Sequence, residues 1–317
     1  MNKERVEVEV IGFDPGYADI KESRRDKETG EIINRKYPSL VAKAPSAAKD
    51  MPLFEGDRYY MGEDALARSS EDIVELTDYM HLEKISPLFL WKTLKENNID
   101  LDKLKYIVSG LSFSQITKGP DFLKRLSKFK VNNESFNFTG KILLAPQGVG
   151  AKYAIDYFYP DGPSTYLIID IGLLTIDTVD VINNVVRPEN VHGYRDEGII
   201  RIARSLQDYI AEKFEEHVSL KEIKEILETK VYFLEGEEHD LSAIIEEYSR
   251  SYTEITLKTL KDRFSREFKK YRKIYFVGGG AHFIDKDVSK VIEVLPNPEY
   301  YNSIGNLLRG EQELASK

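Results

Sequence analysis

The sequence predicts an α/β protein built from two similar lobes. Two segments, "FDPGYADIK" at 13–21 and "DIGLLTIDTV" at 170–179, each place an aspartate and a glycine in a turn between two strands. Each half then continues through helices to a strand that ends in a glycine-containing turn and a further helix. Between the halves, "PDGPST" at 160–165 concentrates residues typical of a linker. The order of elements therefore repeats, although the sequence has no repeat of fixed period.

The first half is predicted to have the order β-β-β-α-β-α-β-α. Residues 5–13 alternate as in a strand, and the charged segment after Pro15-Gly16 is typical of a hairpin around Thr29-Gly30. Residues 87–97 have the apolar spacing of a helix, with Pro87 suited to its first turn. The other expected elements are a strand near 58–61, a helix from 63, a strand at 105–114, a helix at 121–129, and a strand, turn and helix over 140–159.

The second half is predicted to begin with a strand pair at 166–186. Amphipathic helices are expected to follow at 197–217, 219–228 and 242–271, and the length of the last one predicts a division into two segments. The acidic segment 234–242 is interpreted as a solvated connection between helices, with a filament contact as the alternative.

Composition and charge limit the function classes. The 317 residues are 41% hydrophobic, enough for a sizeable core, and carry a formal net charge of −9. Because neutralising phosphates requires clustered lysine and arginine, a surface that wraps nucleic acid by itself is not expected. The absence of cysteine excludes disulfides, thiolate zinc sites and a cysteine nucleophile. No 18-residue apolar run or signal-peptide pattern occurs, so we expect a cytoplasmic protein without a membrane contact.

The first turn has the chemistry of a phosphate site. Asp14 ends a buried strand, Gly16 follows two residues later, and Lys21 begins the next strand. Such a turn offers backbone N–H groups to a phosphate, the lysine neutralises it, and the aspartate can hold hydrated Mg²⁺. A plain hairpin with a surface lysine is the alternative, since aspartate and glycine are common in turns.

Two later segments extend this pattern. The second half opens with the same residue types, at Asp170, Gly172, Thr175 and Asp177. Two such turns in equivalent lobes are suited to face each other across one phosphate chain. In "KIYFVGGGAHFI" at 273–284, a strand breaks into glycines that let a ligand approach the backbone closely, although a tight strand-to-helix turn is the alternative. The spacing of these glycines matches neither a Rossmann fingerprint nor a P-loop.

These segments, in this order, resemble the motifs of the actin, Hsp70 and sugar-kinase superfamily, and within it the actin-like proteins of the ParM/StbA plasmid-segregation type. "FDPGYADIK" resembles the phosphate-1 motif, "DIGLLTIDTV" the phosphate-2 motif and "FVGGGAHFI" the adenosine motif. Four further segments resemble the family's strand-to-helix corner, its Gly-Leu-Pro strand, its connecting motif and its terminal segment: "YYMGEDAL", "IVSGLSFSQ", "APQGVGA" and "NPEYYNSIGNLLRG". The matches run along nearly the whole chain.

The resemblance implies the two-lobed actin-like ATPase fold, in which each lobe is a mixed five-stranded sheet flanked by helices. Domain I is expected at 1–160, with a small insertion at about 25–95, and residues 301–317 are expected to complete it. Domain II is expected at 161–300, with a helical insertion at about 195–255.

The resemblance also implies a filament-forming enzyme that hydrolyses ATP or GTP with Mg²⁺. Asp14 and Asp170 would hold the metal through water, and Gln147 would orient the attacking water, helped by Asp177. A cap on the following helix is the alternative role for Gln147. The implied catalytic residues are Gln147, Asp177 and Asp170. The implied nucleotide-binding residues are Asp14, Gly16, Tyr17, Ala18, Asp19, Lys21, Gly172, Leu173, Leu174, Thr175, Gly278, Gly279, Gly280 and Ala281.

The implied partners are further copies of the chain and a DNA-binding adaptor, which would couple the filament to DNA such as a plasmid. Slow hydrolysis is expected, because a neutral glutamine positions water without acting as a strong base. A cytoskeletal or organelle-positioning actin-like protein, a sugar or acetate-type kinase, and a scaffold that binds nucleotide without turnover are the alternatives. The place of Gln147 favours the actin-like branch over the kinases.

One motif departs from the family pattern. Leu173 and Leu174 stand where the phosphate-2 motif usually has Gly-Gly or Gly-x-Gly. Their N–H groups are expected to remain available if the leucine side chains point away from the phosphate. A leucine at position 174 does not adopt positive φ easily. If the turn needs positive φ there, the predicted cost is about 1 kcal/mol or more for a bulky residue.

Overall fold

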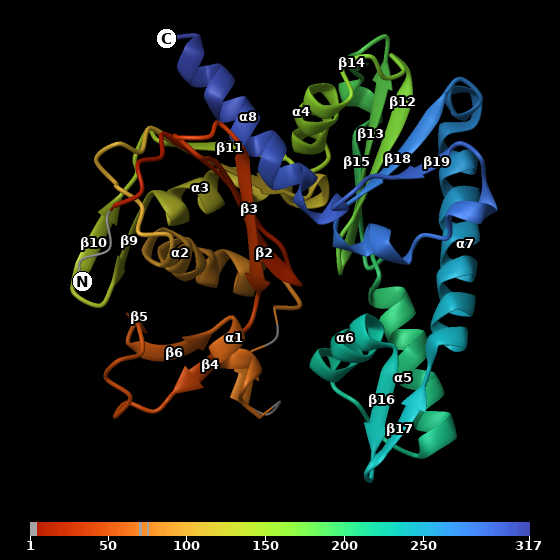
Figure 1. Cartoon of the computed structure of the whole chain (residues 1–317), viewed down its shortest axis with the longest axis horizontal. Helices are drawn as coiled ribbons and strands as arrows, with labels where there is room; N and C mark the ends of the chain where they lie inside the picture. Colours follow the sequence, from red (N-terminus) through yellow and green to blue (C-terminus); the bar gives the residue numbers. More distant parts are fainter. Residues whose placement is uncertain (1–4, 70–71, 75) are drawn as a thin grey trace. The chain divides into compact units, whose positions relative to one another are not determined.

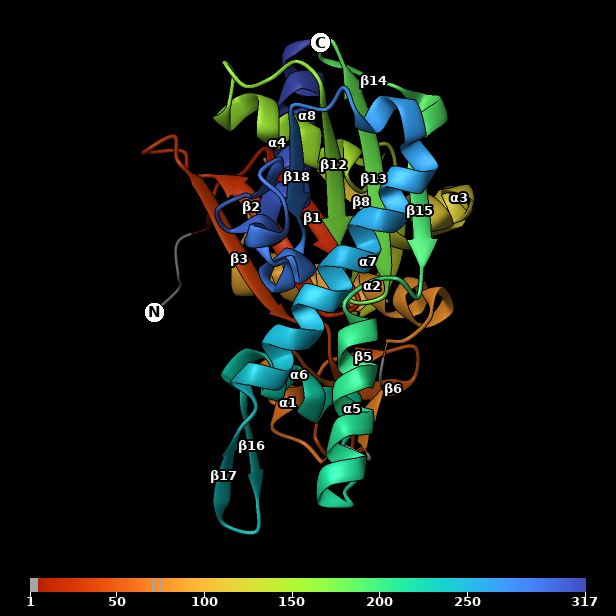
Figure 2. The same cartoon turned by 90° about the vertical axis from the view of Figure 1, so that its right-hand side faces the viewer.

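The chain forms two compact units in the computed structural model, which describes residues 5–69, 72–74 and 76–317 (Figures 1 and 2). Unit 1 comprises Met1–Gly162, Val191–Gly193 and Glu299–Lys317. Unit 2 comprises Pro163–Asn190 and Tyr194–Pro298. The α/β class with a sheet in each half is confirmed, and each unit is described by itself.

Unit 1 is built on a mixed five-stranded sheet, as predicted. Its strand order is β11-β8-β1-β2-β3, where β1 pairs antiparallel with β2 and parallel with β8. The strands are β1 (Val10–Pro15), β2 (Asp19–Arg25), β3 (Ile32–Pro38), β8 (Tyr106–Leu111) and β11 (Ile142–Pro146). Every residue of β1 and β8 is buried, because helices cover the sheet.

The helices of unit 1 are α2 (Tyr79–Glu96), α3 (Gly119–Ser127), α4 (Val149–Phe158) and α8 (Tyr301–Ala315), with a 3₁₀ turn η2 (Phe113–Lys118). The expectation that Pro87 begins α2 is wrong. The helix begins after Asp78, whose side chain accepts the His81 N–H, and Leu82 and Ile85 extend its buried face. The free energy gained by packing these residues exceeds the cost of the backbone hydrogen bond that Pro87 cannot donate.

The predicted strand at 105–114 also ends earlier than expected. The Ser112 side chain accepts the Ser114 N–H at 3.3 Å, which turns the chain into η2.

A second, four-stranded sheet lies between β3 and α2 in the chain. Its order is β5-β6-β4-β7, formed by β4 (Val41–Ala44), β5 (Leu53–Phe54), β6 (Asp57–Met61) and β7 (Ile73–Val74), with the short helix α1 (Glu63–Leu66). A separate hairpin, β9 (Lys128–Val131) and β10 (Glu134–Asn137), follows α3. Sequence analysis did not predict this hairpin, although its Asn132-Asn133 turn, with φ of 55° at Asn132, is a usual hairpin signal.

Unit 2 contains the second sheet. Five strands follow the path β14-β13-β12-β18-β19, and β15 pairs with β13 as a sixth, one more than predicted. The strands are β12 (Tyr166–Ile171), β13 (Thr175–Ile182), β14 (Val185–Val186), β15 (His192–Arg195), β18 (Lys273–Val277) and β19 (Ile292–Val294).

The helices of unit 2 are α5 (Ile200–Phe214), α6 (Leu220–Thr229) and α7 (Ser242–Phe268), with 3₁₀ turns that include η4 (Gly279–Phe283). The segment interpreted as a plain connection forms a hairpin, β16 (Val231–Leu234) and β17 (Glu237–Asp240). Its Glu235-Gly236 turn has φ of 50° and 92°, which matches the twist of a two-residue hairpin. The expected division of α7 is present as a non-helical residue, Ser265.

Candidate functional site

Three residues expected at the site meet in unit 1. Gln147 Nε2 donates to Asp14 Oδ1 at 2.8 Å, and Lys21 Nζ lies 4.0 Å from Asp14 Oδ2. Asp14 and Lys21 are register partners on β1 and β2, and Gln147 follows β11. Asp14 is 3% exposed and Lys21 8% exposed, so Lys21 is not a surface lysine.

The turn between β1 and β2 is tied down by its own backbone. The Gly16 N–H donates to the carbonyls of Asp14 and Asp19, each at 3.1 Å. A Cβ on Gly16 would lie 2.8 Å from the Asp19 carbonyl oxygen and 2.9 Å from Lys21 Nζ, so a larger residue would displace the lysine. The turn is further held by the side chains of Ser39, which donates to the Gly16 carbonyl at 2.6 Å, and Gln115, which donates to the Tyr17 hydroxyl at 2.6 Å.

Lys36 is a cation near this turn that sequence analysis missed. It is the register partner of Lys21 on β3, so Asp14, Lys21 and Lys36 form one row across three strands. Burial lowers its pKa, but Asp19 and Glu299 outweigh that effect and raise it overall; Glu299 Oε1 lies 3.5 Å from Lys36 Nζ. The Thr29-Gly30 hairpin could have indicated this row, because it returns the chain alongside β2.

Helix α8 supports the residue next to Gln147. Gly148 begins α4 with φ of 78° and no side-chain cap, so Gln147 is not the cap of that helix. Instead, the Gly148 N–H donates to Asn302 Oδ1 of α8 at 2.9 Å. Sequence analysis missed Asn302, because 154 residues separate it from Gly148.

The glycine turn of unit 2 is built without the strain expected of its leucines. Leu173 and Leu174 are 5% and 8% exposed, and neither has a positive φ. The carbonyls of Gly172, Leu173 and Leu174 accept the N–H groups of Ile199, Ile200 and Gly198 at 3.1, 2.9 and 3.4 Å. The predicted penalty at position 174 is therefore wrong, because these bonds fix the turn in ordinary backbone conformations.

The same arrangement leaves backbone N–H groups at the turn that can donate hydrogen bonds to a ligand. In the part of the chain that the structure describes, the N–H groups of Leu173 and Leu174 donate no hydrogen bond to the protein. With both side chains buried and the carbonyls bonded to the segment before α5, these two amides are suited to an anion.

The two aspartates of unit 2 that were expected at the site lie side by side. Asp170 on β12 is the register partner of Asp177 on β13, which places their Cβ atoms about 5 Å apart on one face of the sheet. They are 6% and 1% exposed. Thr175, the first residue of β13, is also buried, and its carbonyl accepts the Gly172 N–H at 2.8 Å.

The three glycines after β18 have different roles. Gly278 has φ of 83°, and a Cβ there would lie 2.4 Å from Asp170 Oδ1 and 2.4 Å from the Ile171 carbonyl oxygen. A Cβ on Gly280 would lie 2.4 Å from Ile171 Cγ2, whereas one on Gly279 would meet nothing within 4 Å. Packing therefore requires Gly278 and Gly280, while Gly279 faces open space. Ala281 is buried behind them.

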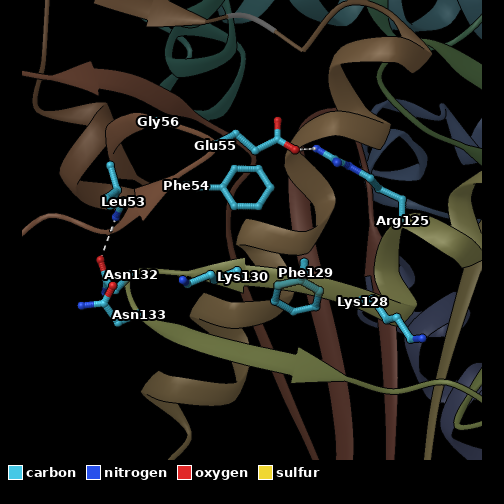
Figure 3. A pocket seen from close by; sticks show the side chains of 10 residues that line it. All are labelled: Leu53, Phe54, Glu55, Gly56, Arg125, Lys128, Phe129, Lys130, Asn132 and Asn133. Carbon is cyan, nitrogen blue, oxygen red and sulfur yellow. Dashed lines mark hydrogen bonds and ion pairs between the residues drawn. The ribbon is translucent and has the colours of Figure 1, made fainter.

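A pocket of about 490 Å³ in unit 1 lies apart from these residues, and none of the expected site residues lines it (Figure 3). Its walls join the β5–β6 turn to α3 and β9, and Arg125 contacts Glu55 across it. Leu53 N–H donates to Asn132 Oδ1 at 2.8 Å at its other side. The contacts that cross this pocket bind the two walls to each other.

Residues 5–69, 72–74 and 76–317 contain no group of three or more histidine, aspartate or glutamate side chains placed to hold a metal ion directly. Within the same residues, no helix has both the length and the apolar character needed to cross a membrane.

Comparison with known proteins places the fold. Residues 168–290 match the family model described as archaeal actin homologue MreB-like, C-terminal. No curated protein matches the chain. ParM from a 15-stranded filament of Clostridium botulinum is 19% identical, with a TM-score of 0.76 over 96% of this chain and 99% of that one.

Two further solved structures have the same fold as this chain. The archaeal actin homologue Ta0583 is 19% identical, with a TM-score of 0.74 over 96% of this chain and 99% of that one. Bacillus thuringiensis ParM, solved with ATP, is 18% identical, with a TM-score of 0.64 over 98% of this chain and 100% of that one. The chain therefore has the actin-like fold of ParM and the archaeal actin homologue, and its residues 168–290 are similar to the MreB-like C-terminal family model.

Proposed function

We propose that this chain is a cytoplasmic, filament-forming actin-like protein that hydrolyses ATP or GTP and moves or positions DNA, such as a plasmid, through a separate DNA-binding adaptor. The observation that supports the proposal is a set of groups in each unit that are suited to bind phosphate. Unit 1 offers Lys21 beside Asp14 and Gln147. Unit 2 offers the two undonated amides of Leu173 and Leu174 beside Asp170.

The residues present fit a nucleotide with Mg²⁺. Lys21 and the amides of Leu173 and Leu174 would bind the phosphates, and the open side of Gly279 would accept the adenosine or guanosine. Asp14 and Asp170 would hold the metal through water. Bound Mg²⁺ would neutralise charge that develops on the phosphates.

Gln147 has the geometry of a water-positioning residue. Because its Nε2 donates to Asp14, its Oε1 is the amide atom left to accept a hydrogen bond from a water. Asp14 and the Asn302–Gly148 bond would fix this orientation. Such a residue orients the water without removing its proton, which supports slow hydrolysis that times the life of a polymer.

Light scattering and phosphate release, measured with ATP, GTP, ADP or no nucleotide at matched Mg²⁺, test the proposal. Polymer is expected with a triphosphate, followed by phosphate release. The absence of nucleotide-dependent polymer under every condition contradicts the cytoskeletal function. Polymer without phosphate release identifies a scaffold that binds nucleotide without turnover.

Gln147→Ala is expected to slow phosphate release about 10²-fold, because the water loses its positioning group, while nucleotide affinity is retained. Its polymers should persist after assembly. Gln207→Ala is the matched control, since that side chain donates to the Val218 carbonyl in unit 2. Rapid disassembly of the Gln147→Ala polymer contradicts the water-positioning role.

A further inference from the structure

The pocket of unit 1 shown in Figure 3 is a basic site on an acidic protein. Its walls carry three basic side chains, Arg125, Lys128 and Lys130, and one acidic side chain, Glu55. The whole chain has a formal charge of −9, so most of its surface repels anions. The volume of about 490 Å³ lies within the roughly 300–1,000 Å³ that is typical of ligand pockets. A ligand of this pocket is distinct from the nucleotide, because none of the expected nucleotide-binding residues lines it.

One carboxylate, that of Glu55, already lies in this pocket. Arg125 Nη2 donates to Glu55 Oε1, and the guanidinium lies over the Phe54 ring, 5.6 Å from its centroid. Glu55 and Gly56 form the β5–β6 turn, with positive φ of 51° and 93°, which brings the carboxylate to α3. The contact shows the kind of anion that the cations of this pocket accept.

Lys128 and Lys130 are the other two cations of the pocket. Both residues are exposed, and neither forms an ion pair within residues 5–69, 72–74 and 76–317. They are alternate residues of β9, so they lie on one face of the strand, about 7 Å apart. An extended peptide repeats its side chains on one face at the same interval. Carboxylates at alternate positions of such a peptide therefore match the two lysines.

Strand β9 also has an unpaired backbone edge. Among the described strands, it pairs with β10 in a sheet of two. The Phe138 N–H donates to the Ser127 carbonyl at 2.7 Å, so this pair is a hydrogen-bonded one. Because bonded and unbonded pairs alternate along an antiparallel ladder, the backbone groups of Lys128 and Lys130 point away from β10. In the described part of the chain, these groups make no hydrogen bond to other backbone groups.

Contacts on both sides of the hairpin hold this edge in place. Phe129 stacks on Phe136 with ring centroids 5.0 Å apart, and Phe138 packs against both rings. At the turn, the Asn132 N–H donates to the Leu53 carbonyl at 2.8 Å, and Asn132 Oδ1 accepts the Leu53 N–H at 2.8 Å. An edge that is already ordered loses little conformational entropy when a ligand binds.

We propose that this pocket binds an extended acidic segment of a partner protein, which adds to the free edge of β9 and places alternate carboxylates beside Lys128 and Lys130. Main-chain hydrogen bonds fix the register of the segment, and the two lysines select its acidic side chains. An acidic partner is repelled by most of this chain, so a local basic site directs it to one place.

Nucleic acid fits this surface less well than an acidic peptide does. A protein that binds a duplex neutralises many phosphates along an extended basic surface. Here two unpaired lysines lie in a pocket whose wall also carries the carboxylate of Glu55.

A fluorescein-labelled peptide in which glutamate alternates with valine tests the proposal, by fluorescence anisotropy with the full chain and without nucleotide. We expect this peptide to bind, and a peptide with glutamine in place of each glutamate to bind about tenfold more weakly or worse. Lys128→Glu/Lys130→Glu should lower affinity for the glutamate peptide by about tenfold or more. Lys286→Glu/Lys290→Glu, at two exposed lysines of unit 2, makes the same charge change and should bind the peptide like the unaltered chain.

N-methylated peptides test the strand pairing without any change to the protein. An added strand directs the amides of every second residue toward its neighbour. Two glutamate peptides are therefore compared, one methylated on each alternate set of amides. One is expected to bind about tenfold more weakly and the other to bind normally. An equal effect in both peptides means that the segment does not add to β9.

Two other results overturn the proposal. If the glutamate peptide binds no more tightly than the glutamine peptide, or binds Lys128→Glu/Lys130→Glu as tightly as the unaltered chain, the pocket is not a site for an acidic segment. If a DNA strand or duplex displaces the peptide and loses its own binding in that variant, the surface is one for nucleic acid. None of these measurements uses nucleotide, so they stand or fall separately from the proposed function.

Discussion

Asp170→Ala is expected to abolish stable nucleotide binding and to lower nucleotide affinity by about 10²-fold or more. The reason is that the substitution removes the carboxylate that would hold the metal beside the phosphates. Asp170 is the last residue but one of β12, close in sequence to the two undonated amides, and its Oδ1 would lie only 2.4 Å from a Cβ on Gly278. Titration with a fluorescent nucleotide, and the rise in Tm that nucleotide produces, measure the change.

Asp170→Asn is the control for folding in this experiment. It keeps the shape of the side chain that Gly278 contacts and removes only the charge. We expect the asparagine chain to unfold at nearly the original Tm without nucleotide, yet to lose most of its Mg²⁺-dependent affinity. If both variants bind nucleotide as tightly as the unaltered chain, the turn is a structural hairpin and the assignment of Asp170 is wrong.

Gly305→Ala is expected to lower the free energy of unfolding by about 3 kcal/mol or more, at the upper range for overpacking. A Cβ at this position would lie 1.7 Å from the Gly150 carbonyl oxygen, so α8 and α4 would have to separate. Backbone atoms cannot yield as a flexible side chain does. Denaturant unfolding followed by circular dichroism measures the loss.

Gly279→Ala is the matched control, because a Cβ there would meet nothing within 4 Å. It should leave the free energy of unfolding unchanged, and it should weaken nucleotide binding if the nucleoside uses that open side. A Gly305→Ala chain as stable as the unaltered one would show that α8 does not pack against α4 as described.

The sequence predicted the sheets because their strands are local patterns. β1 and β12 are apolar runs that end in aspartate and a glycine turn, and both appear as buried strands with those turns. Gln147 could be named only by resemblance, because its bond to Asp14 joins residues 133 positions apart. No local pattern indicates which distant side chain a loop will meet.

The misjudged features share a cause in tertiary contacts. The strain expected at Leu174 is absent because N–H groups of residues 198–200, just before α5, hold the turn's carbonyls. Pro87 lies inside α2 because packing of the preceding residues extends the helix past it. At Pro87 the local preference against a helix amounts to a few kcal/mol, which burial of neighbouring apolar groups can exceed.

The place of α8 has a consequence for the order in which the protein can fold during synthesis. The chain leaves unit 1 after Gly162 and, apart from Val191–Gly193, returns to it only at Glu299. Leu307 of α8 packs with Val10 and Val108, and Gly12 approaches the Ser303 carbonyl so closely that a Cβ would lie 1.9 Å from it. Strands β1 and β8 are therefore synthesised before α8, and the face that α8 covers stays exposed until α8 has been made.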